Sequence, residues 1–232
     1  MIEVIVFDAD DTLWHNETLF KVAENKLADL LADYHPSDFV IETHLETEGR
    51  NIKTYGYGVK GFTLSMIETA IDLTEGKIPP EDIRKIIGFG KEMLDADVVL
   101  LEGVCETIEK LSKSYPLMII TKGDLLDQQR KVARSGLGDF FKHIEVVSNK
   151  TSKTYEKVLA KHDIVPQHFL MVGNSLKSDV LPVVEIGGQA VYIPNSTTWA
   201  HEAVSQEDAD RKEYYEIENI GQLVKIIEKK EK

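Results

Sequence analysis

Hydrophobic and polar residues along this chain follow two patterns, one helical and one alternating between strands and helices. Residues 2–7 form a nearly continuous apolar, β-branched run interrupted only by Glu3, which predicts a buried strand. Over 16–96 the apolar residues recur at helical spacing, and Pro36 and the prolines at 79–80 separate the helices. This region predicts four helices, at 18–34, 37–48, 61–73 and 80–94.

Beyond residue 99, predicted strands alternate with predicted helices. The strands are expected at 117–121, 143–147, 169–172, 190–193 and 214–217, and the helices at 104–112, 125–135, 154–162, 180–186 and 220–229. Such alternation predicts a parallel sheet that is covered on both faces. The strand at 2–7 has no partner nearby in sequence, so we expect it to join this later sheet.

The predicted fold class is therefore α/β, a doubly wound parallel sheet of the Rossmann-like type with an inserted helical domain. We expect residues 1–14 and 97–232 to form the α/β core. Residues 15–96 then form the helical insertion after the first strand.

Composition and charge narrow the classes of function. The 232 residues include 27 Lys and Arg against 40 Asp and Glu, so the formal net charge is −13. This excess repels nucleic-acid backbones and anionic membrane surfaces, and we expect neither as a partner. Cys105 is the single cysteine, the N-terminus is acidic, and no apolar run approaches the ~18 residues of a membrane span. We therefore expect a cytoplasmic protein.

Two aspartates follow the first predicted strand. Asp8 and Asp10 come directly after the run 2–7, and ligands of parallel α/β sheets bind beyond the carboxyl ends of the strands. Two carboxylates so close repel each other unless a cation lies between them or one is protonated. A hard, oxygen-ligated ion such as Mg²⁺ meets that need. Asp11, by contrast, fits an ordinary turn or helix N-cap.

Three later predicted strands also end in polar residues. The turn 121–123 offers a hydroxyl and backbone N–H groups for phosphate oxygens. After the strand at 143–147, Lys150 or Lys153 can neutralise a phosphate. After the strand at 169–172, Asn174 and Asp179 can complete the coordination shell of an ion. Each feature alone is also typical of a turn, a cap or a solvated lysine, but all of them suit one metal–phosphate site.

In this order and placement, the strand ends resemble the haloacid dehalogenase (HAD) superfamily, in the branch dominated by Mg²⁺-dependent phosphatases. The stretches similar to its four motifs are Asp8-x-Asp10-x-Thr12, Thr121-x-Gly123, a lysine near 150, and Gly173-Asn174-Ser175-x-x-x-Asp179. The helical insertion between the first two motifs is similar to the C1-type cap of that superfamily. The resemblance covers nearly the whole core.

The resemblance implies a two-step reaction. Asp8 would attack the phosphorus and form an aspartyl-phosphate that water later hydrolyses. Asp10 would protonate the leaving oxygen and then deprotonate the water, while its backbone carbonyl binds Mg²⁺. Thr121, with backbone N–H groups near Asp10 and Lys122, would hold the phosphoryl oxygens. Mg²⁺ would bridge Asp8 and the phosphate, and because a halide needs no proton, the presence of Asp10 argues against dehalogenation.

Two positions depart from the superfamily pattern. Most relatives have aspartate where this chain has Asn174, whose neutral amide lowers the charge of the metal site by one, so Asp179 would bind the metal directly or through water. The third motif lacks the proline that often follows its lysine, which leaves Lys150 and Lys153 as alternatives. We favour Lys150 because it lies nearer the strand end and 24 residues before Asn174.

The predicted site thus has three groups of residues. The catalytic candidates are Asp8, Asp10 and Lys150, the metal candidates are Asp8, Asp10, Asn174 and Asp179, and the phosphate or substrate candidates are Thr121, Lys122, Gly123, Tyr57 and Lys60. Tyr57 and Lys60 belong to the segment 50–62, in which glycines, tyrosines and basic residues interrupt the predicted helices. An ordinary helix–helix connection is the alternative interpretation of that segment.

The function that these features favour is a Mg²⁺-dependent phosphatase for a small phosphorylated metabolite, acting as a monomer or homodimer. A phosphotransferase or phosphomutase, which passes the aspartyl-phosphate to a hydroxyl instead of water, has the same motifs. A catalytically weak phospho-binding relative is a further alternative because of Asn174. Receiver-like signalling modules fit less well, since they are about half this length and carry their phosphorylated aspartate after a later strand.

Overall fold

The computed structural model of the chain describes residues 2–195, 202, 204–205 and 214–230. The chain divides into two compact units. One unit comprises Met1–Glu17, Val98–Lys122 and Gln128–Lys232, and the other comprises Thr18–Asp97 together with Gly123–Asp127. The short segment Gly123–Asp127, which the sequence-based division places in the core, thus groups with the helical insertion.

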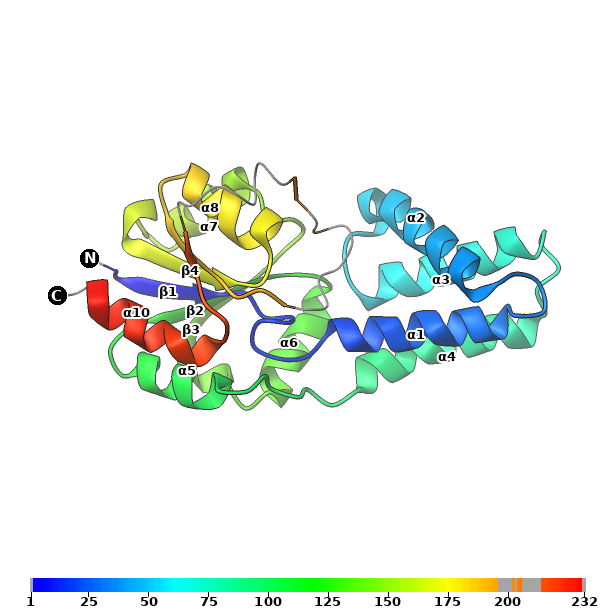
Figure 1. Ribbon diagram of the computed structural model, residues 1–232, viewed down its shortest axis with the longest axis horizontal. Helices are drawn as coiled ribbons and strands as arrows, with labels where there is room; N and C mark the ends of the chain where they lie inside the picture. The colour runs from blue at the N-terminus through cyan, green and yellow to red at the C-terminus, as the bar shows by residue number, and fades with distance from the viewer. Residues whose placement is uncertain (1, 196–201, 203, 206–213, 231–232) are drawn as a thin grey trace. The chain divides into compact units, whose positions relative to one another are not determined.

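A six-stranded parallel sheet with the order β3-β2-β1-β4-β5-β6 forms the centre of the first unit (Figure 1). Its strands are β1 (Val4–Phe7), β2 (Leu117–Lys122), β3 (Phe141–Val147), β4 (Phe169–Gly173), β5 (Gln189–Tyr192) and β6 (Tyr215–Glu216). In the register, Ile5 of β1 lies opposite Leu117 of β2 and Leu170 of β4. The prediction that the N-terminal strand joins the later sheet is confirmed.

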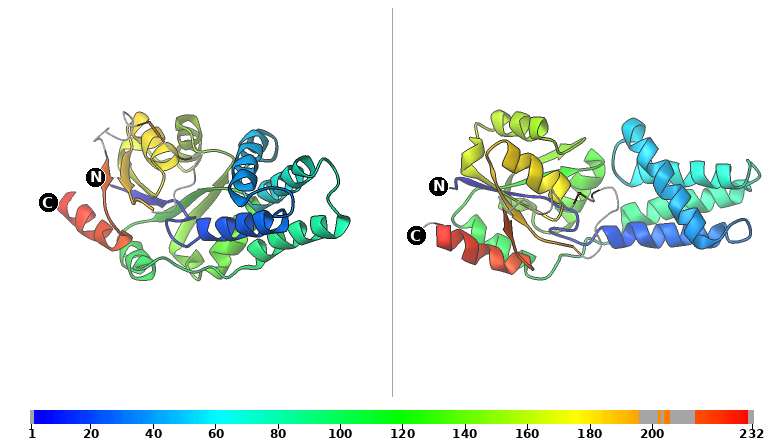
Figure 2. Two further views of the ribbon diagram at one scale, coloured as in Figure 1. Left: turned by 45° about the vertical axis from the view of Figure 1, so that its right-hand side comes forward. Right: turned by 45° about the horizontal axis from the view of Figure 1, so that its top comes forward.

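Helices cover both faces of this sheet, as Figures 1 and 2 show. The helices of this unit are α5 (Val104–Ser112), α6 (Leu125–Arg134) from Gln128 onward, α7 (Ser152–Lys161), α8 (Leu181–Glu185) and α10 (Leu223–Lys230). Ile5 and Phe7 share one core with apolar residues of α5, α6 and α10. Val4 and Val6 share another core with residues of α7 and α8. Because successive strand residues point to opposite faces, the apolar run of β1 supplies both cores, and the doubly wound fold is confirmed.

Four helices form the second unit. They are α1 (Glu17–Leu30), α2 (Ser37–Tyr55), α3 (Val59–Leu73) and α4 (Pro80–Asp95). Their apolar stripes meet in one core that includes Leu27, Val40, Phe62 and Ile86. Pro80 occupies the first turn of α4, where its missing N–H leaves no helical bond unmade. In the described ranges, no helix is both long enough and apolar enough to pass through a membrane.

The segment 50–62 interrupts the helices as predicted, but the break is shorter than the segment, most of which is helical. α2 continues to Tyr55 and α3 begins at Val59, so the connection is only 56–58. Gly56 and Gly58 both have positive φ, at 75° and 117°. The two glycines end one helix and precede the next, but the tyrosines and basic residues around them remain compatible with helix.

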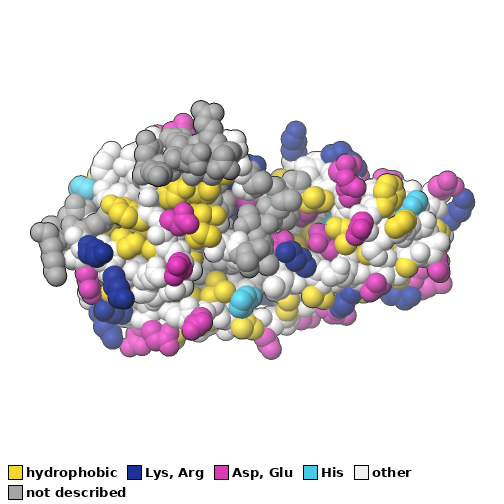
Figure 3. Space-filling view, in the orientation of Figure 1, with side chains coloured by type: hydrophobic (Ala, Val, Ile, Leu, Met, Phe, Trp, Pro, Cys, Tyr) yellow, Lys and Arg dark blue, Asp and Glu magenta, His cyan; other side chains and the backbone are white. Residues whose placement is uncertain are grey.

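Acidic and basic side chains are interspersed over the described part of the face that Figure 3 shows. Several of them form exposed ion pairs, for example Lys26 with Glu92 and Lys113 with Glu109. Exposed pairs of this kind contribute little to stability. The net charge of −13 therefore bears on solubility and on the choice of partners, and the fold depends on its apolar cores.

Phe62 and Leu64 of α3 offer a test of the helical unit with an internal control. Phe62 is 2% exposed, and its ring makes edge contacts with Phe20 and His44, with centroids 4.8 Å apart in both pairs. Phe62→Ala should lower the free energy of unfolding by about 3–5 kcal/mol in urea titrations, because it leaves a cavity. Leu64 is 45% exposed, so Leu64→Ala should change the free energy of unfolding by less than about 0.5 kcal/mol. Equal effects of the two variants would contradict this packing.

Candidate active site

The polar residues that follow four strands come from segments far apart in the sequence. Asp8 follows β1, Thr121 lies near the end of β2, Lys150 lies between β3 and α7, and Asn174 follows β4. Because all these strands are parallel, their carboxyl ends meet at one edge of the sheet. Tertiary contacts then decide which of the predicted residues touch.

A buried ion cluster joins three of the predicted site residues, Asp8, Lys150 and Asp179. The Lys150 ammonium donates to Asp8 Oδ1 and, at 2.6 Å, to Asp179 Oδ1. Asp179 is in η3 (Leu176–Val180), a π-helical turn after β4. Lys150 is 3% exposed, Asp8 7% and Asp179 1%. Lys153, the alternative lysine, is exposed on α7, so the geometry favours Lys150.

Two carboxylates in this cluster share one ammonium, and the pKa values of Asp8 and Lys150 are shifted. Burial raises the pKa of Asp8 to about 7, against the opposing effect of Lys150. Burial alone would lower the pKa of Lys150, but Asp179 and Asp8 outweigh it and hold that pKa above its ordinary value. Lys150 therefore stays charged, while Asp8 lacks enough positive charge around it to ionise easily.

Gly173 makes the position of Asp179 compatible with the end of β4. A Cβ atom at residue 173 would lie 2.3 Å from Asp179 Oδ2 and 2.4 Å from its Cγ. The same carboxylate accepts the backbone N–H of Ser175 at 3.1 Å. Any side chain at 173 would push the Asp179 carboxylate away from Lys150, so this glycine provides space at the site.

Oxygen atoms suitable for a hard cation surround Thr12. Its Oγ1 lies 3.0 Å from Asp8 Oδ2 and 3.1 Å from Asn174 Oδ1, and one hydroxyl proton satisfies only one of them at a time. Together with the surplus negative charge of Asp8 and Asp179, this donor set fits Mg²⁺. Among the residues that the structure describes, no group of three or more His, Cys, Asp and Glu side chains could hold a metal. The amide of Asn174, a backbone carbonyl or water would have to complete the shell.

The Asp10 carboxylate is held by other side chains. Trp14 Nε1 donates to its Oδ1 at 2.7 Å, and Lys131 Nζ does so at 3.1 Å. Gln128 Nε2 donates to its Oδ2 at 2.7 Å. Any contribution of Asp10 to a metal would therefore come from its backbone carbonyl, as the sequence resemblance implies.

The turn at the end of β2 combines a buried threonine with a glycine of positive φ. Thr121 is 1% exposed, and Gly123 has a φ of 127°, which an L side chain rarely adopts. Lys122 extends to the turn after β4, where its Nζ donates to Ser178 Oγ at 2.9 Å. Lys122 also pairs with Glu202, whose carboxylate accepts from Ser178 Oγ at 2.7 Å. Thr121 and Gly123 remain predicted phosphate ligands, and Lys122 links the ends of β2 and β4.

Tyr57 and Lys60 lie in the helical unit. Tyr57 is half-buried in the connection 56–58, and Lys60 is exposed in the first turn of α3. Lys60 Nζ donates to Asp124 Oδ1 at 3.0 Å within that unit. Their proposed contact with a substrate stays a prediction.

Sequence reasoning missed the residues of α6 that touch Asp10. Gln128 and Lys131 are three residues apart, so they lie on one face of the helix. No motif marks them, because lysine and glutamine are common on exposed helix faces. Only the structure shows that Gln128 is 2% exposed, so no signal in the sequence could have found it. Asp11, as predicted, caps a helix, since its carboxylate accepts the backbone N–H groups of Asn16 and Glu17 at the start of α1.

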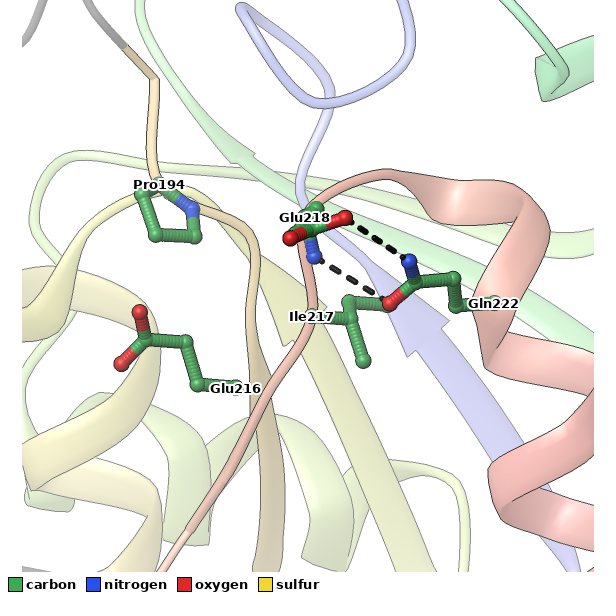
Figure 4. Close-up of a pocket in the computed structure, with 5 residues that line it drawn as sticks. All are labelled: Pro194, Glu216, Ile217, Glu218 and Gln222. Carbon is green, nitrogen blue, oxygen red and sulfur yellow. Dashed lines mark hydrogen bonds between the residues drawn. The ribbon is translucent and has the colours of Figure 1, made fainter.

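A separate pocket of about 540 Å³ lies beyond β5 and β6 (Figure 4). Its lining consists of Pro194, Glu216, Ile217, Glu218 and Gln222. Glu218 and Gln222 hydrogen-bond each other, with 3.2 Å between Gln222 Nε2 and Glu218 Oε2. None of the predicted site residues lines this pocket.

Proteins of known family and structure resemble this chain over most of its length. A family model described as haloacid dehalogenase-like hydrolase matches residues 2–187. A glyceraldehyde 3-phosphate phosphatase of Pyrococcus furiosus is 27% identical over 237 residues, which cover 98% of this chain and 94% of that protein.

Solved structures show the same fold. A haloacid dehalogenase-like family hydrolase from Xanthomonas campestris is 39% identical, with a TM-score of 0.87 over 98% of this chain and 91% of that one. The hydrolase YfnB of Bacillus subtilis, solved with bound magnesium, is 19% identical, with a TM-score of 0.68 over 98% and 99% of the two chains. At that identity the second structure supports the fold alone.

The raised pKa of Asp8 predicts how stability depends on pH in the metal-free protein. The folded state holds a proton on Asp8 up to about pH 7, whereas the unfolded chain holds it only up to about pH 4. The folded state therefore binds more protons between these values. The contribution of Asp8 to the free energy of unfolding is fully present below about pH 4 and is lost as the pH rises through about 7.

Asp8→Asn removes this titration while keeping the shape of the side chain. In urea titrations with EDTA, the free energy of unfolding of Asp8→Asn minus that of the wild type should be larger at pH 8 than at pH 5. Asp139→Asn, at an exposed position, is the control and should show no such trend. A constant difference between Asp8→Asn and the wild type across this range would rule out the raised pKa.

Proposed function

The chain belongs to the haloacid dehalogenase-like hydrolase family, and on that premise we propose that it is a Mg²⁺-dependent phosphatase of small phosphorylated metabolites. The reaction would proceed through an aspartyl-phosphate on Asp8. The observation that carries this proposal is the buried contact of Lys150 with both Asp8 and Asp179. It places a cation and two carboxylates beside the turn that follows β1.

Phosphate transfer to Asp8 requires that an anionic nucleophile approach an anionic substrate. Lys150 supplies one positive charge at Asp8 Oδ1, and Mg²⁺, when bound, would supply further positive charge that lowers the repulsion between Asp8 and the phosphate. Asp8, Asn174 and Asp179 would hold the ion through oxygen atoms, together with the Asp10 backbone carbonyl. Thr121 and the backbone N–H groups of the 121–123 turn would bind the phosphoryl oxygens.

In the first step, Asp8 Oδ forms a bond to phosphorus while the bond from phosphorus to the leaving oxygen breaks. Asp10 gives its proton to that leaving oxygen. In the second step, Asp10 takes a proton from water, whose oxygen then attacks the phosphorus and releases Asp8 and inorganic phosphate. Asp10 therefore ends the cycle protonated, as it began.

The helical unit would serve as the cap that selects the substrate, with Tyr57 and Lys60 as the candidate contacts. Short-chain sugar phosphates are the first substrates to test, because the relative from Pyrococcus furiosus is named for glyceraldehyde 3-phosphate. A phosphotransferase of the same family is the second candidate. It would be recognised by a phosphorylated acceptor that accumulates in place of free phosphate.

Asp8→Asn tests the proposed reaction directly. The variant should release no inorganic phosphate from glyceraldehyde 3-phosphate, other sugar phosphates, nucleotides or phenyl phosphate with Mg²⁺ present, because an amide cannot act as the nucleophile. The wild type should release phosphate from at least one of them and stop when EDTA is added. Asp139→Asn is the matched control and should retain wild-type activity. Full activity of Asp8→Asn would refute the mechanism.

Asn174→Asp tests the proposed metal ligand without any substrate. Restoring a carboxylate adds one negative charge to the donor set, so Mg²⁺ should bind about 10-fold more tightly in calorimetric titrations. Asn219→Asp, which adds the same charge at an exposed turn, should leave the affinity unchanged. Equal affinities of the wild type and Asn174→Asp would remove residue 174 from the ligand set.

A further inference from the structure

The side chain of Asp10 is held by three N–H donors from two parts of the fold. Trp14 and Lys131 donate to Oδ1, and Gln128 donates to Oδ2. Trp14 belongs to the turn after β1, where it also forms a backbone bridge with Asp10. Gln128 and Lys131 belong to α6. The carboxylate that follows the first strand is thus anchored to a helix that follows the second.

The partners of Gln128 determine how its amide is oriented. Its Nε2 donates to Asp10 Oδ2 at 2.7 Å and to the backbone carbonyl of Lys122 at 2.8 Å. Both partners are acceptors, so only the NH₂ end of the amide suits this position. Gln128 is buried, and its Oε1 has no hydrogen-bond partner among the described residues. Burying an unpaired oxygen costs free energy, so the two hydrogen bonds that the NH₂ group of Gln128 donates must offset that cost.

Lys131, like Gln128, donates to a second acceptor besides Asp10. Its Nζ donates to Asn16 Oδ1 at 2.7 Å as well as to Asp10 Oδ1. The Lys131 side chain is only 13% exposed, so its ammonium is not a freely moving surface charge. Asn16 comes just before α1, and Lys131 therefore ties the turn after β1 to α6.

Among the residues that the structure describes, these contacts leave one position on Asp10 for proton transfer. A carboxylate has about four lone-pair sites in its plane, two on each oxygen. Trp14 and Lys131 occupy both sites of Oδ1, and Gln128 occupies one of Oδ2. The remaining site on Oδ2 is where a proton can be carried.

We infer that Gln128 and Lys131 are positioning residues, which orient the Asp10 carboxyl so that its free Oδ2 site delivers the proton to the leaving oxygen. This inference rests on the proposed function, in which Asp10 is the general acid. Gln128 also donates to the Lys122 carbonyl. It therefore sets the distance between the general acid and the turn that would bind the phosphoryl group.

The test separates positioning from a merely structural role by the leaving group. Phenyl phosphate releases a basic oxygen that needs a proton, whereas 2,4-dinitrophenyl phosphate releases an oxygen that needs none. The value of kcat/KM covers only the steps up to release of the phenol, so it isolates the acid step from the later attack of water. Lys131→Met and Gln128→Met remove the donors while keeping much of the side-chain volume.

We expect both variants to lose about 10-fold or more in kcat/KM for phenyl phosphate, since general acid catalysis contributes about 10²–10⁴-fold. For 2,4-dinitrophenyl phosphate the loss should be under about threefold, which also shows that the variants fold. Arg130→Met and Gln129→Met alter exposed neighbours on the same helix and should match the wild type on both substrates. Lys131→Arg should recover part of the loss, because a guanidinium can also donate to Asp10.

The possible results separate the positioning role of the α6 residues from the proposed function. Equal losses on both phosphates, or no loss on either, would overturn the positioning role. Asp10→Asn should show the same dependence on the leaving group with a larger loss. If Asp10→Asn shows it and the α6 variants do not, the proposed function stands and the inference about α6 fails. If the wild type hydrolyses neither of these phosphates, nor any sugar phosphate or nucleotide, with Mg²⁺ present, the proposed function itself fails.

Discussion

The ammonium group of Lys150 joins the ends of three strands through two buried ion pairs, with Asp8 after β1 and Asp179 after β4. Removing an ion from water costs several kcal/mol, so a buried cluster of this kind persists only when opposite charges face each other. Two carboxylates against one ammonium leave an excess of negative charge. Burial and that excess raise the pKa of Asp8, so either a proton on Asp8 or one further cation would balance the charge there.

The surrounding fold supports this cluster through contacts that are individually modest. Gly173 leaves room for the Asp179 carboxylate beside the end of β4. Thr12 brings Asp8 and Asn174 around one hydroxyl. Gln128 joins Asp10 to the carbonyl of Lys122. Asp8 is thus joined to Asn174 through Thr12, and the acid candidate Asp10 is joined through Gln128 to the turn that we propose binds phosphate.

Much of this arrangement could be predicted from the sequence, and the failures have local causes. The strands were predictable because a parallel strand buried on both faces has a continuous apolar run, as at Val4–Phe7. The break within 50–62 was predicted to be too long because glycines and tyrosines are typical of loops, yet α2 runs to Tyr55 and α3 begins at Val59. Gln128 and Lys131 were missed because nothing in a helical sequence tells which polar residue faces a distant carboxylate.

The sequence by itself determined the elements and the order in which acids, hydroxyls and lysines follow the strands, because these depend on periodicity and on neighbours along the chain. Only the tertiary structure decided which of those groups touch. Lys150 lies in the ion cluster and Lys153 is exposed, although both follow β3 within six residues. The Asp10 side chain contacts α6 through residues more than a hundred positions away. Which side chains come into contact depends on distances across the sheet, because burial and Coulomb attraction do not depend on separation in sequence.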